Sequence, residues 1–259
     1  MSTNPQSPVR RLLLALDACD CVLDDGMLAI ELAALIGAEL HGIFIEDSDL
    51  LRLAQLPFAR EVGARSGQDR PIARESLESV LRRRVERVAG ELERAGKQRN
   101  VPVSHRTARG KRVRQALEHG ERGDVVLLAP SARTRRIERA RPGGIGPVMI
   151  WWEDRAASAS FDVAIHLARR LSTGLLVGFP AARYQSASDA RARLADVLVR
   201  APGPVRIHGI VDPSARTLIE AARAQHVAQL VLSSEAALAS TETLERLLDE
   251  LGAGVILVR

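Results

Sequence analysis

Residues 11–17 read Arg-Leu-Leu-Leu-Ala-Leu-Asp, and residues 147–153 read Pro-Val-Met-Ile-Trp-Trp-Glu. Each stretch is an apolar strand that ends in a carboxylate, and each precedes a polar turn and a helix rich in Ala and Leu. A pattern of this length that occurs twice in one chain predicts two related structural units. We therefore expect one domain over residues 9–145 and a second, diverged domain over residues 146–259.

Strands and helices alternate through both copies, which predicts an α/β fold with parallel sheets covered by helices on both faces. The expected strands span residues 11–17, 39–46, 101–107, 124–129, 148–153, 173–179, 205–211, 227–232 and 254–258. The expected helices span residues 24–36, 49–56, 75–97, 111–121, 156–171 and 187–199, with two more that begin after Asp212-Pro213 and near Ser240, and a polar loop covers residues 63–71. The stretch between Ala129 and Pro147 is too short for both a helix and another strand, so we expect the first copy to lack its final strand.

The composition is that of a folded protein with aliphatic cores. Of the 259 residues, 46% are hydrophobic but only 3% are aromatic, so Leu, Val, Ile and Ala must fill the interior. No apolar run approaches the ~18 residues of a membrane span, and residues 1–8 are too polar for the core of a signal peptide. These features predict a soluble, cytoplasmic protein that does not contact a membrane.

Right-handed crossovers place the ligand site of such a fold at the carboxyl ends of its strands. In the first copy this edge carries Asp17, Glu46, Arg109, Ala129 and Pro130, and in the second it carries Glu153, Pro180, Asp212, Ser233 and Ser234. Trp151 and Trp152 are neighbours on one strand and so point to opposite faces of the sheet, where we expect both to pack in the core, with stacking of one of them on a ligand as the alternative.

Three stretches carry a family resemblance. Residues 13–17 and residues 38–47, Ala-Glu-Leu-His-Gly-Ile-Phe-Ile-Glu-Asp, resemble the start of a universal stress protein domain. Residues 49–62, Asp-Leu-Leu-Arg-Leu-Ala-Gln-Leu-Pro-Phe-Ala-Arg-Glu-Val, resemble an insertion in some bacterial members. The second copy resembles a diverged domain of the same kind. The resemblance implies tandem flavodoxin-like domains of the adenine nucleotide alpha hydrolase type, adenine-nucleotide binding and dimers formed through the last strand.

Members of that family that bind ATP carry G-x2-G-x9-G-[ST] after the fourth strand. Glycines allow the main chain to approach phosphate, and amide groups at a helix start supply hydrogen-bond donors. The matching positions here are Pro130, Arg133, Gly143 and Gly144, so only the third glycine is kept. Proline has no amide hydrogen, and the Arg133 side chain would crowd a tight phosphate turn. The second copy has no glycine over residues 233–237, and Glu235 would repel phosphate.

The degraded motif predicts that no ATP cofactor is bound tightly. The alternative is a nucleotide-binding protein with at most weak ATPase activity. That alternative would use Asp17, the main chain near Phe44, Arg133, Gly143 and Gly144. The resemblance gives Asp17 a role in binding ribose or adenine, but Asp17 could equally cap the turn that follows its strand.

Other chemistries find less support in the sequence. Cys19 and Cys21 read as two reduced thiols in a loop, with a redox-sensing pair as the sharper alternative. The six histidines show no metal-binding spacing, and Ser233-Ser234 has no nucleophile elbow, so neither a metal site nor a hydrolase triad is expected.

A cluster of arginines in one loop raises the question of nucleic acid. Arginine binds phosphate through a planar fork, but binders of RNA or single-stranded DNA usually interleave stacking aromatics, and this stretch has none. The cluster comprises Arg133, Arg135, Arg136, Arg139 and Arg141. We therefore interpret it as a solvated loop, with an anion site as the alternative and nucleic acid as a third, weaker option.

Together these features predict a non-catalytic, stress-related regulatory or binding protein of the universal stress protein type. Its partner would be an unidentified protein, with a homodimer as a further possibility.

Overall fold

The computed structural model describes residues 11–62, 67–72, 74–130, 146–153, 157–183, 187–236 and 238–259. The first half of the chain contains β1 (Arg11–Asp17), α1 (Leu23–Ile36), β2 (Glu39–Glu46), α2 (Ser48–Leu53), β3 (Arg60–Val62), β4 (Asp69–Pro71), α3 (Arg74–Gln98), β5 (Val103–Arg109), α4 (Arg112–His119) and β6 (Val125–Leu128). The second half contains β7 (Val148–Trp151), α6 (Ala157–Arg170), β8 (Leu175–Pro180), a short 3-10 helix (Ala181–Arg183), α7 (Ala187–Arg193), α8 (Ala195–Arg200), β9 (Val205–Ile210), α9 (Ala215–Ala224), β10 (Gln229–Ser233), α10 (Thr241–Glu250) and β11 (Gly254–Val258).

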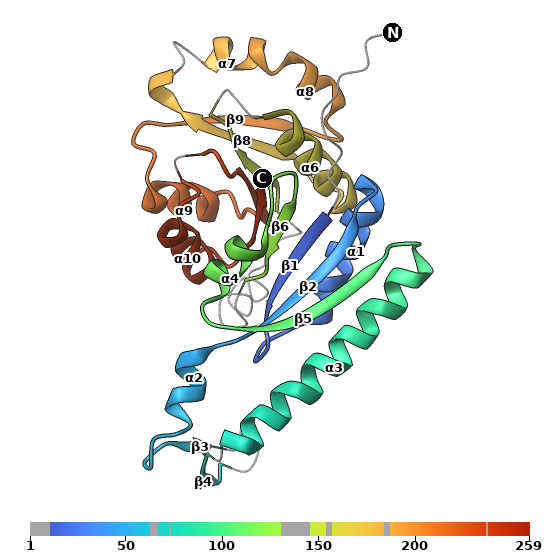
Figure 1. The fold of residues 1–259 in the computed structure, drawn as a ribbon. Helices are drawn as coiled ribbons and strands as arrows, with labels where there is room; N and C mark the ends of the chain where they lie inside the picture. The colour runs from blue at the N-terminus through green and yellow to red at the C-terminus, as the bar shows by residue number, and fades with distance from the viewer. Residues whose placement is uncertain are drawn as a thin grey trace.

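One sheet of nine strands runs through both halves, in the order β5-β2-β1-β6-β11-β10-β7-β8-β9 (Figure 1). All neighbours are parallel except β6 and β11, which meet antiparallel. The strand order of the first half, β5-β2-β1-β6, is repeated in the second half as β9-β8-β7-β10. The α/β fold predicted from the sequence is confirmed, as one large, mostly parallel sheet. The division into domains at residue 145 stays a prediction, because the sheet is continuous across it.

The place beside β6 is taken by the last strand of the second half. Val255–Val258 pairs with residues 125–128 on one side and with β10 on the other. Both edges of β6 are therefore paired, so a fifth strand of the first copy has no position next to it. The two halves consequently share β11 as a structural element.

Strand residues alternate between two aliphatic cores. Leu12, Leu14 and Leu16 of β1 point into a core that also contains α1, α3, α6, α7 and α8. Leu13 and Ala15 point into a second core with α4, α9 and α10. The central strands of the sheet are thus buried on both faces, as their apolar runs require, whereas the edge strands β5 and β9 are largely exposed. Trp151 lies in one core and Trp152 in the other, and both are buried, which confirms the sequence interpretation.

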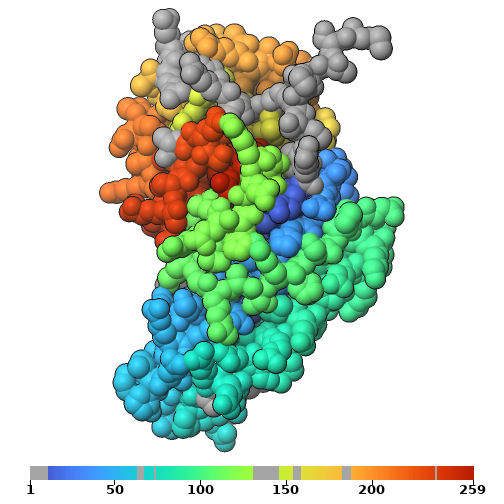
Figure 2. Space-filling view, viewed as in Figure 1, coloured from blue at the N-terminus to red at the C-terminus, as the bar shows by residue number. Residues whose placement is uncertain are grey.

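Residues 47–62 and 67–72 form an extension beyond the sheet, beside the start of α3, that appears as a lobe in Figure 2. The predicted helix ends earlier, at Leu53, and part of the predicted loop is a hairpin in which residues 60–62 pair antiparallel with residues 69–71. Ion pairs join the two strands, Arg60 with Asp69 at 2.6 Å and Arg70 with Glu61. The loop prediction was wrong for β4 because both strands of this hairpin are short and exposed, so they lack the apolar pattern that predicts a strand.

The halves are also joined by a charged bridge on one face of the sheet. The Glu31 carboxylate on α1 accepts hydrogen bonds from Arg170 of α6 at 2.9 Å and from Arg99 at 3.0 Å. The Arg170 guanidinium, more than that of Arg99, lowers the pKa of Glu31. The contact ties a helix of the first half to a helix of the second.

Candidate functional site

The turn after β1 lies at the carboxyl edge of the sheet and is built around Asp17. The Asp17 carboxylate accepts a hydrogen bond from the Cys19 amide at 2.8 Å, and its carbonyl accepts one from the Asp20 amide at 3.0 Å. This side chain therefore caps its own turn, the Asx geometry that favours a tight reversal. The capping interpretation describes the structure, and a role for Asp17 in binding ribose or adenine stays a prediction.

Two neighbouring elements hold this turn in place. The Ala18 amide donates to the Ile45 carbonyl at the end of β2 at 2.9 Å. From the opposite side, the Arg84 guanidinium on α3 donates to the Cys19 carbonyl. The amides of Ala18, Cys19 and Asp20 and the carbonyl of Cys19 are thus already engaged by the protein.

Phe44 lies in β2, two residues before its last residue, Glu46. Its side chain is fully buried and meets the His105 ring edge to face, with 6.0 Å between the ring centroids. Its main chain pairs in register with Leu16 on one side and Thr107 on the other. The Phe44 ring is therefore a core side chain, and only its main chain could contribute to a ligand site.

The remaining predicted nucleotide contacts, Arg133, Gly143 and Gly144, lie outside the described residues, as does the whole arginine cluster. The structure thus brings together Asp17 and Phe44, on adjacent strands, but says nothing of the phosphate side of a first-half site. Pro130, which stands at the first glycine position of the motif, lies two residues after the end of β6.

A polar groove of about 560 Å³ runs between α3 and the edge strand β5. Arg109 donates to Glu46 at 2.8 Å and to Glu78 at 3.4 Å, and Glu78 also accepts from Arg74 at 3.0 Å. The Glu46 carboxylate raises the pKa of Arg109, so the guanidinium stays charged and paired. The sequence placed Glu46 and Arg109 at this edge. It missed Glu78, because a helix residue 32 positions after β2 gives no local signal.

The second-half edge is closed by its own side chains. Trp151 Nε1 donates to the Glu153 carboxylate at 2.5 Å. The Trp152 ring packs edge to face against Phe161 and Phe179, at centroid distances of 6.3 and 6.4 Å. Glu153 therefore orients a buried indole, which is a structural role.

The loop after β10 lies where the family resemblance predicts a phosphate loop in the second half, and four of its amides are bonded within the protein. The Ser234 amide donates to the Val258 carbonyl at 2.8 Å. The Glu235 amide donates to the Ser233 hydroxyl at 3.3 Å, and the Ala236 amide donates to the Ser233 carbonyl at 3.0 Å. The Ala239 amide donates to the Ala236 carbonyl at 2.9 Å. Glu235 is exposed and lies 3.8 Å from Arg122. The loop offers a carboxylate where a phosphate cradle would offer free N–H groups.

The two thiols beside Asp17 are predicted to be unreactive in the folded protein. Burial, followed by the Asp17 carboxylate, raises the pKa of Cys19 to about 12, and burial also raises the pKa of Cys21. Because the thiolate is the nucleophile, an aromatic disulfide reagent at pH 8 should react at least about a hundredfold more slowly than with an unperturbed cysteine.

The rate should rise as the pH increases toward that pKa, and denaturation should expose both thiols at once. In Asp17→Asn one of the groups that raise the pKa of Cys19 is neutral, so this variant should react faster. Rapid reaction of folded wild-type protein would instead support the redox-sensing interpretation.

A serine hydroxyl and a histidine ring meet near the amino ends of β2 and β5, in the first half of the chain. Ser104 Oγ lies 2.7 Å from His41 Nδ1, and burial is the main cause that lowers the pKa of His41. No hydrogen bond among the described residues joins His41 to a carboxylate, so the pair lacks the third group that orients a catalytic base. Both residues are also distant from the carboxyl edge, since they lie near the starts of β2 and β5.

The described part of the chain contains neither a metal-binding group of side chains nor a membrane-spanning helix. No group of three or more His, Cys, Asp or Glu side chains there is arranged to hold a metal ion. None of the helices in these ranges combines the length and apolarity needed to cross a bilayer.

Several solved structures resemble this chain in fold. No family model and no curated protein matches the sequence. A putative universal stress protein from Pseudomonas aeruginosa UCBPP-PA14 superposes over 98% of this chain and 95% of its own, with 13% identity and a TM-score of 0.50. A universal stress protein from Archaeoglobus fulgidus DSM 4304 covers 98% and 99%, with 10% identity and a TM-score of 0.46. The cytoplasmic domain of a prokaryotic cation chloride cotransporter covers 96% and 94%, with 9% identity and a TM-score of 0.46. The chain therefore has the α/β fold of the universal stress proteins.

Proposed function

We propose that this chain is a non-catalytic regulatory or binding protein of the universal stress protein type that does not hold ATP tightly. The observation that carries the proposal is the loop after β10, where four amides donate to groups of the protein itself. A triphosphate is normally bound by free amides at such a loop, and four amides of this one are already engaged within the protein. A stress-linked regulatory or scaffolding role through a protein partner is the corresponding activity.

The first half supports the same proposal by its sequence. Pro130 lacks an amide hydrogen at the first glycine position of the motif, and Arg133 carries a bulky side chain at the second. Gly143 and Gly144 would then supply the only unhindered main chain of the motif. Asp17 adds a negative charge, which its own turn already uses as a hydrogen-bond acceptor.

Calorimetric titration with adenosine, AMP, ADP and ATP in the presence of Mg²⁺ tests the proposal. We expect no saturable ATP binding below about 1 mM, which corresponds to less than about 4 kcal/mol of binding free energy. We also expect no gain in affinity as phosphates are added, because an amide cradle is what would produce such a gain. Asp17→Asn is the control for adenosine binding alone.

Micromolar binding of ATP that strengthens from adenosine to ATP would overturn the proposal and support the nucleotide-binding alternative, with its weak ATPase activity. A native mass spectrum of freshly purified protein provides an independent check. It should show the 28.1 kDa chain, or a multiple of it, without nucleotide. The same spectrum gives the number of subunits and so tests the possible homodimer.

A further inference from the structure

The nine-stranded sheet ends at β9, which pairs with β8 and with no other of the described strands. The Leu175 amide donates to the Pro204 carbonyl at 3.0 Å, which fixes the direction of the main-chain groups along β9. In a parallel pair, alternate residues direct both N–H and C=O toward the same neighbour. The N–H and C=O groups of Arg206 and His208 therefore face β8, whereas those of Val205, Ile207 and Gly209 point outward from the sheet.

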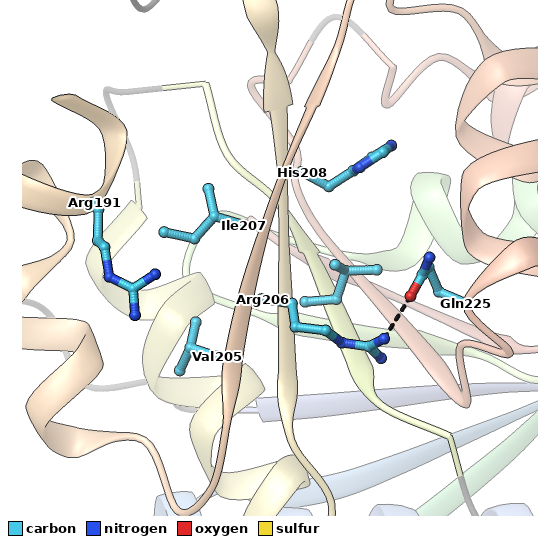
Figure 3. A pocket seen from close by; sticks show the side chains of 7 residues that line it. Arg191, Val205, Arg206, Ile207, His208 and Gln225 are labelled. Atoms are coloured by element: carbon cyan, nitrogen blue, oxygen red, sulfur yellow. Dashed lines mark hydrogen bonds between the residues drawn. The ribbon is translucent and has the colours of Figure 1, made fainter. Parts of the chain in front are cut away.

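A hollow of about 400 Å³ lies along this outer edge. In Figure 3, Arg206, His208 and Gln225 lie on one side of the strand, and Arg191, Val205 and Ile207 lie on the other. A hollow lined from both faces of one strand must pass its outer edge, where the outward main-chain groups are. Residues Val205 to Gly209 of β9 are half-buried or exposed, and the exposed atoms of Gly209 belong to the main chain, so the main chain of β9 is accessible to solvent at that residue.

The charge of the hollow has one sign. Arg191 and Arg206 contribute positive charge, and none of the described residues that line it is acidic. Arg206 donates to the Gln225 side chain at 2.6 Å, a neutral partner that leaves the guanidinium charge uncompensated. On the neighbouring helix α9, the Glu220 carboxylate is paired with Arg216 at 2.9 Å.

We propose that the outer edge of β9 binds an extended acidic segment of a partner protein, which adds to the sheet as a tenth strand. Main-chain hydrogen bonds to Val205, Ile207 and Gly209 supply the strand pairing. Side chains of an added strand alternate between the two faces, so acidic residues would meet Arg206 and His208 on one face. On the other face, apolar residues would meet Val205 and Ile207.

The opposite edge of the sheet provides the contrast. The groove beside β5 has three carboxylates, Glu46, Glu78 and Glu86, against the two guanidinium groups of Arg82 and Arg109, and Arg109 is held by two of these carboxylates. An acidic segment would be repelled there, although β5 also has a free outer edge among the described strands. The proposal therefore concerns β9 alone. It goes beyond the proposed function and does not depend on it, because the nucleotide test concerns the carboxyl edge of the strands.

Fluorescence anisotropy with labelled synthetic peptides tests the proposal on the full chain. The probe is a peptide of about six to eight residues, close to the length of β9, that alternates Glu and Val. Two control peptides keep its charge. One carries N-methyl groups on alternate amides, which removes strand pairing, and the other groups the Glu residues in one block. We expect saturable binding of the alternating peptide only.

Charge reversal in the protein supplies a matched pair of variants. Arg206→Glu should weaken binding by about tenfold or more, because it replaces attraction with repulsion at the hollow. Arg106→Glu makes the same change at an exposed site on the other edge strand and should leave binding unchanged. Amide exchange at Ile207 and Gly209 should slow when peptide is added, and exchange at Thr107 should not.

Three outcomes would overturn the proposal. The first is absence of binding, as expected if the arginines only protect a free edge from pairing with other chains. The second is equal binding of the N-methylated peptide, which would indicate attraction between charges without strand addition. The third is equal weakening by Arg206→Glu and Arg106→Glu.

Discussion

Replacing Asp124 by Asn is expected to lower the free energy of unfolding by about 3 kcal/mol, because removing one partner of a buried ion pair leaves the other charge uncompensated. Asp124 is buried, and its carboxylate accepts from Arg11 at 2.7 Å and from the Glu121 amide at 2.7 Å. This pair joins the start of β1 to the start of β6. Urea unfolding at pH 7 measures the loss.

Glu121→Gln is the matched control. Glu121 also approaches Arg11, at 3.6 Å, but its side chain is 79% exposed against 6% for Asp124. An exposed ion pair contributes little, so this variant should stay within about 0.5 kcal/mol of the wild type. Equal effects of the two substitutions would show that burial does not determine the strength of the Arg11 contacts.

Replacing Ile256 by Ala is expected to lower the free energy of unfolding by about 3 kcal/mol and to destabilise both halves in a single transition. The side chain is fully buried in the middle of β11, and truncation of such a residue typically costs 2–5 kcal/mol. Ile256 pairs with Leu127 on one side and Val231 on the other. Loss of packing at this strand therefore weakens the contact of each half with the other.

The chain offers a probe in each half for this measurement. Both tryptophans lie in the second half, at Trp151 and Trp152, and both cysteines lie in the first, at Cys19 and Cys21. Fluorescence and thiol exposure should follow the same urea curve in wild type and variant, as expected for one cooperative unit. Val211→Ala, at an 85% exposed position, should have little effect. Separate transitions for the two probes would instead support independent domains at residues 9–145 and 146–259.

The strands were the most predictable part of the fold, since their signal is local. The expected bounds at residues 11–17, 39–46 and 254–258 are those observed. Residues 12–16 and 255–258 are runs of apolar residues, and residues 43–45 form a shorter one; a strand buried on both faces needs no more than such a run. The helix expected over residues 187–199 is interrupted at Leu194, where tertiary packing places a break that helical periodicity does not reveal.

The candidate site was predictable only in its residue types. Asp17 and Glu46 could be placed at the carboxyl edge from the ends of their strands. The partners that engage them come from α3 and β5, because Arg84 reaches the turn after Asp17 and Arg109 reaches Glu46. Contacts of this kind join residues about 65 positions apart, and no spacing rule indicates them.

By itself, then, the sequence determined the repeated α/β pattern, the aliphatic core and the loss of the phosphate-binding glycines, because each of these depends on residues close together in the chain. The tertiary structure alone decided that β11 lies between the two halves, that the amides after β10 are internally bonded and that β9 presents an open basic edge. Each of these depends on which distant segments become neighbours, and that is set by the packing of two cores around one sheet.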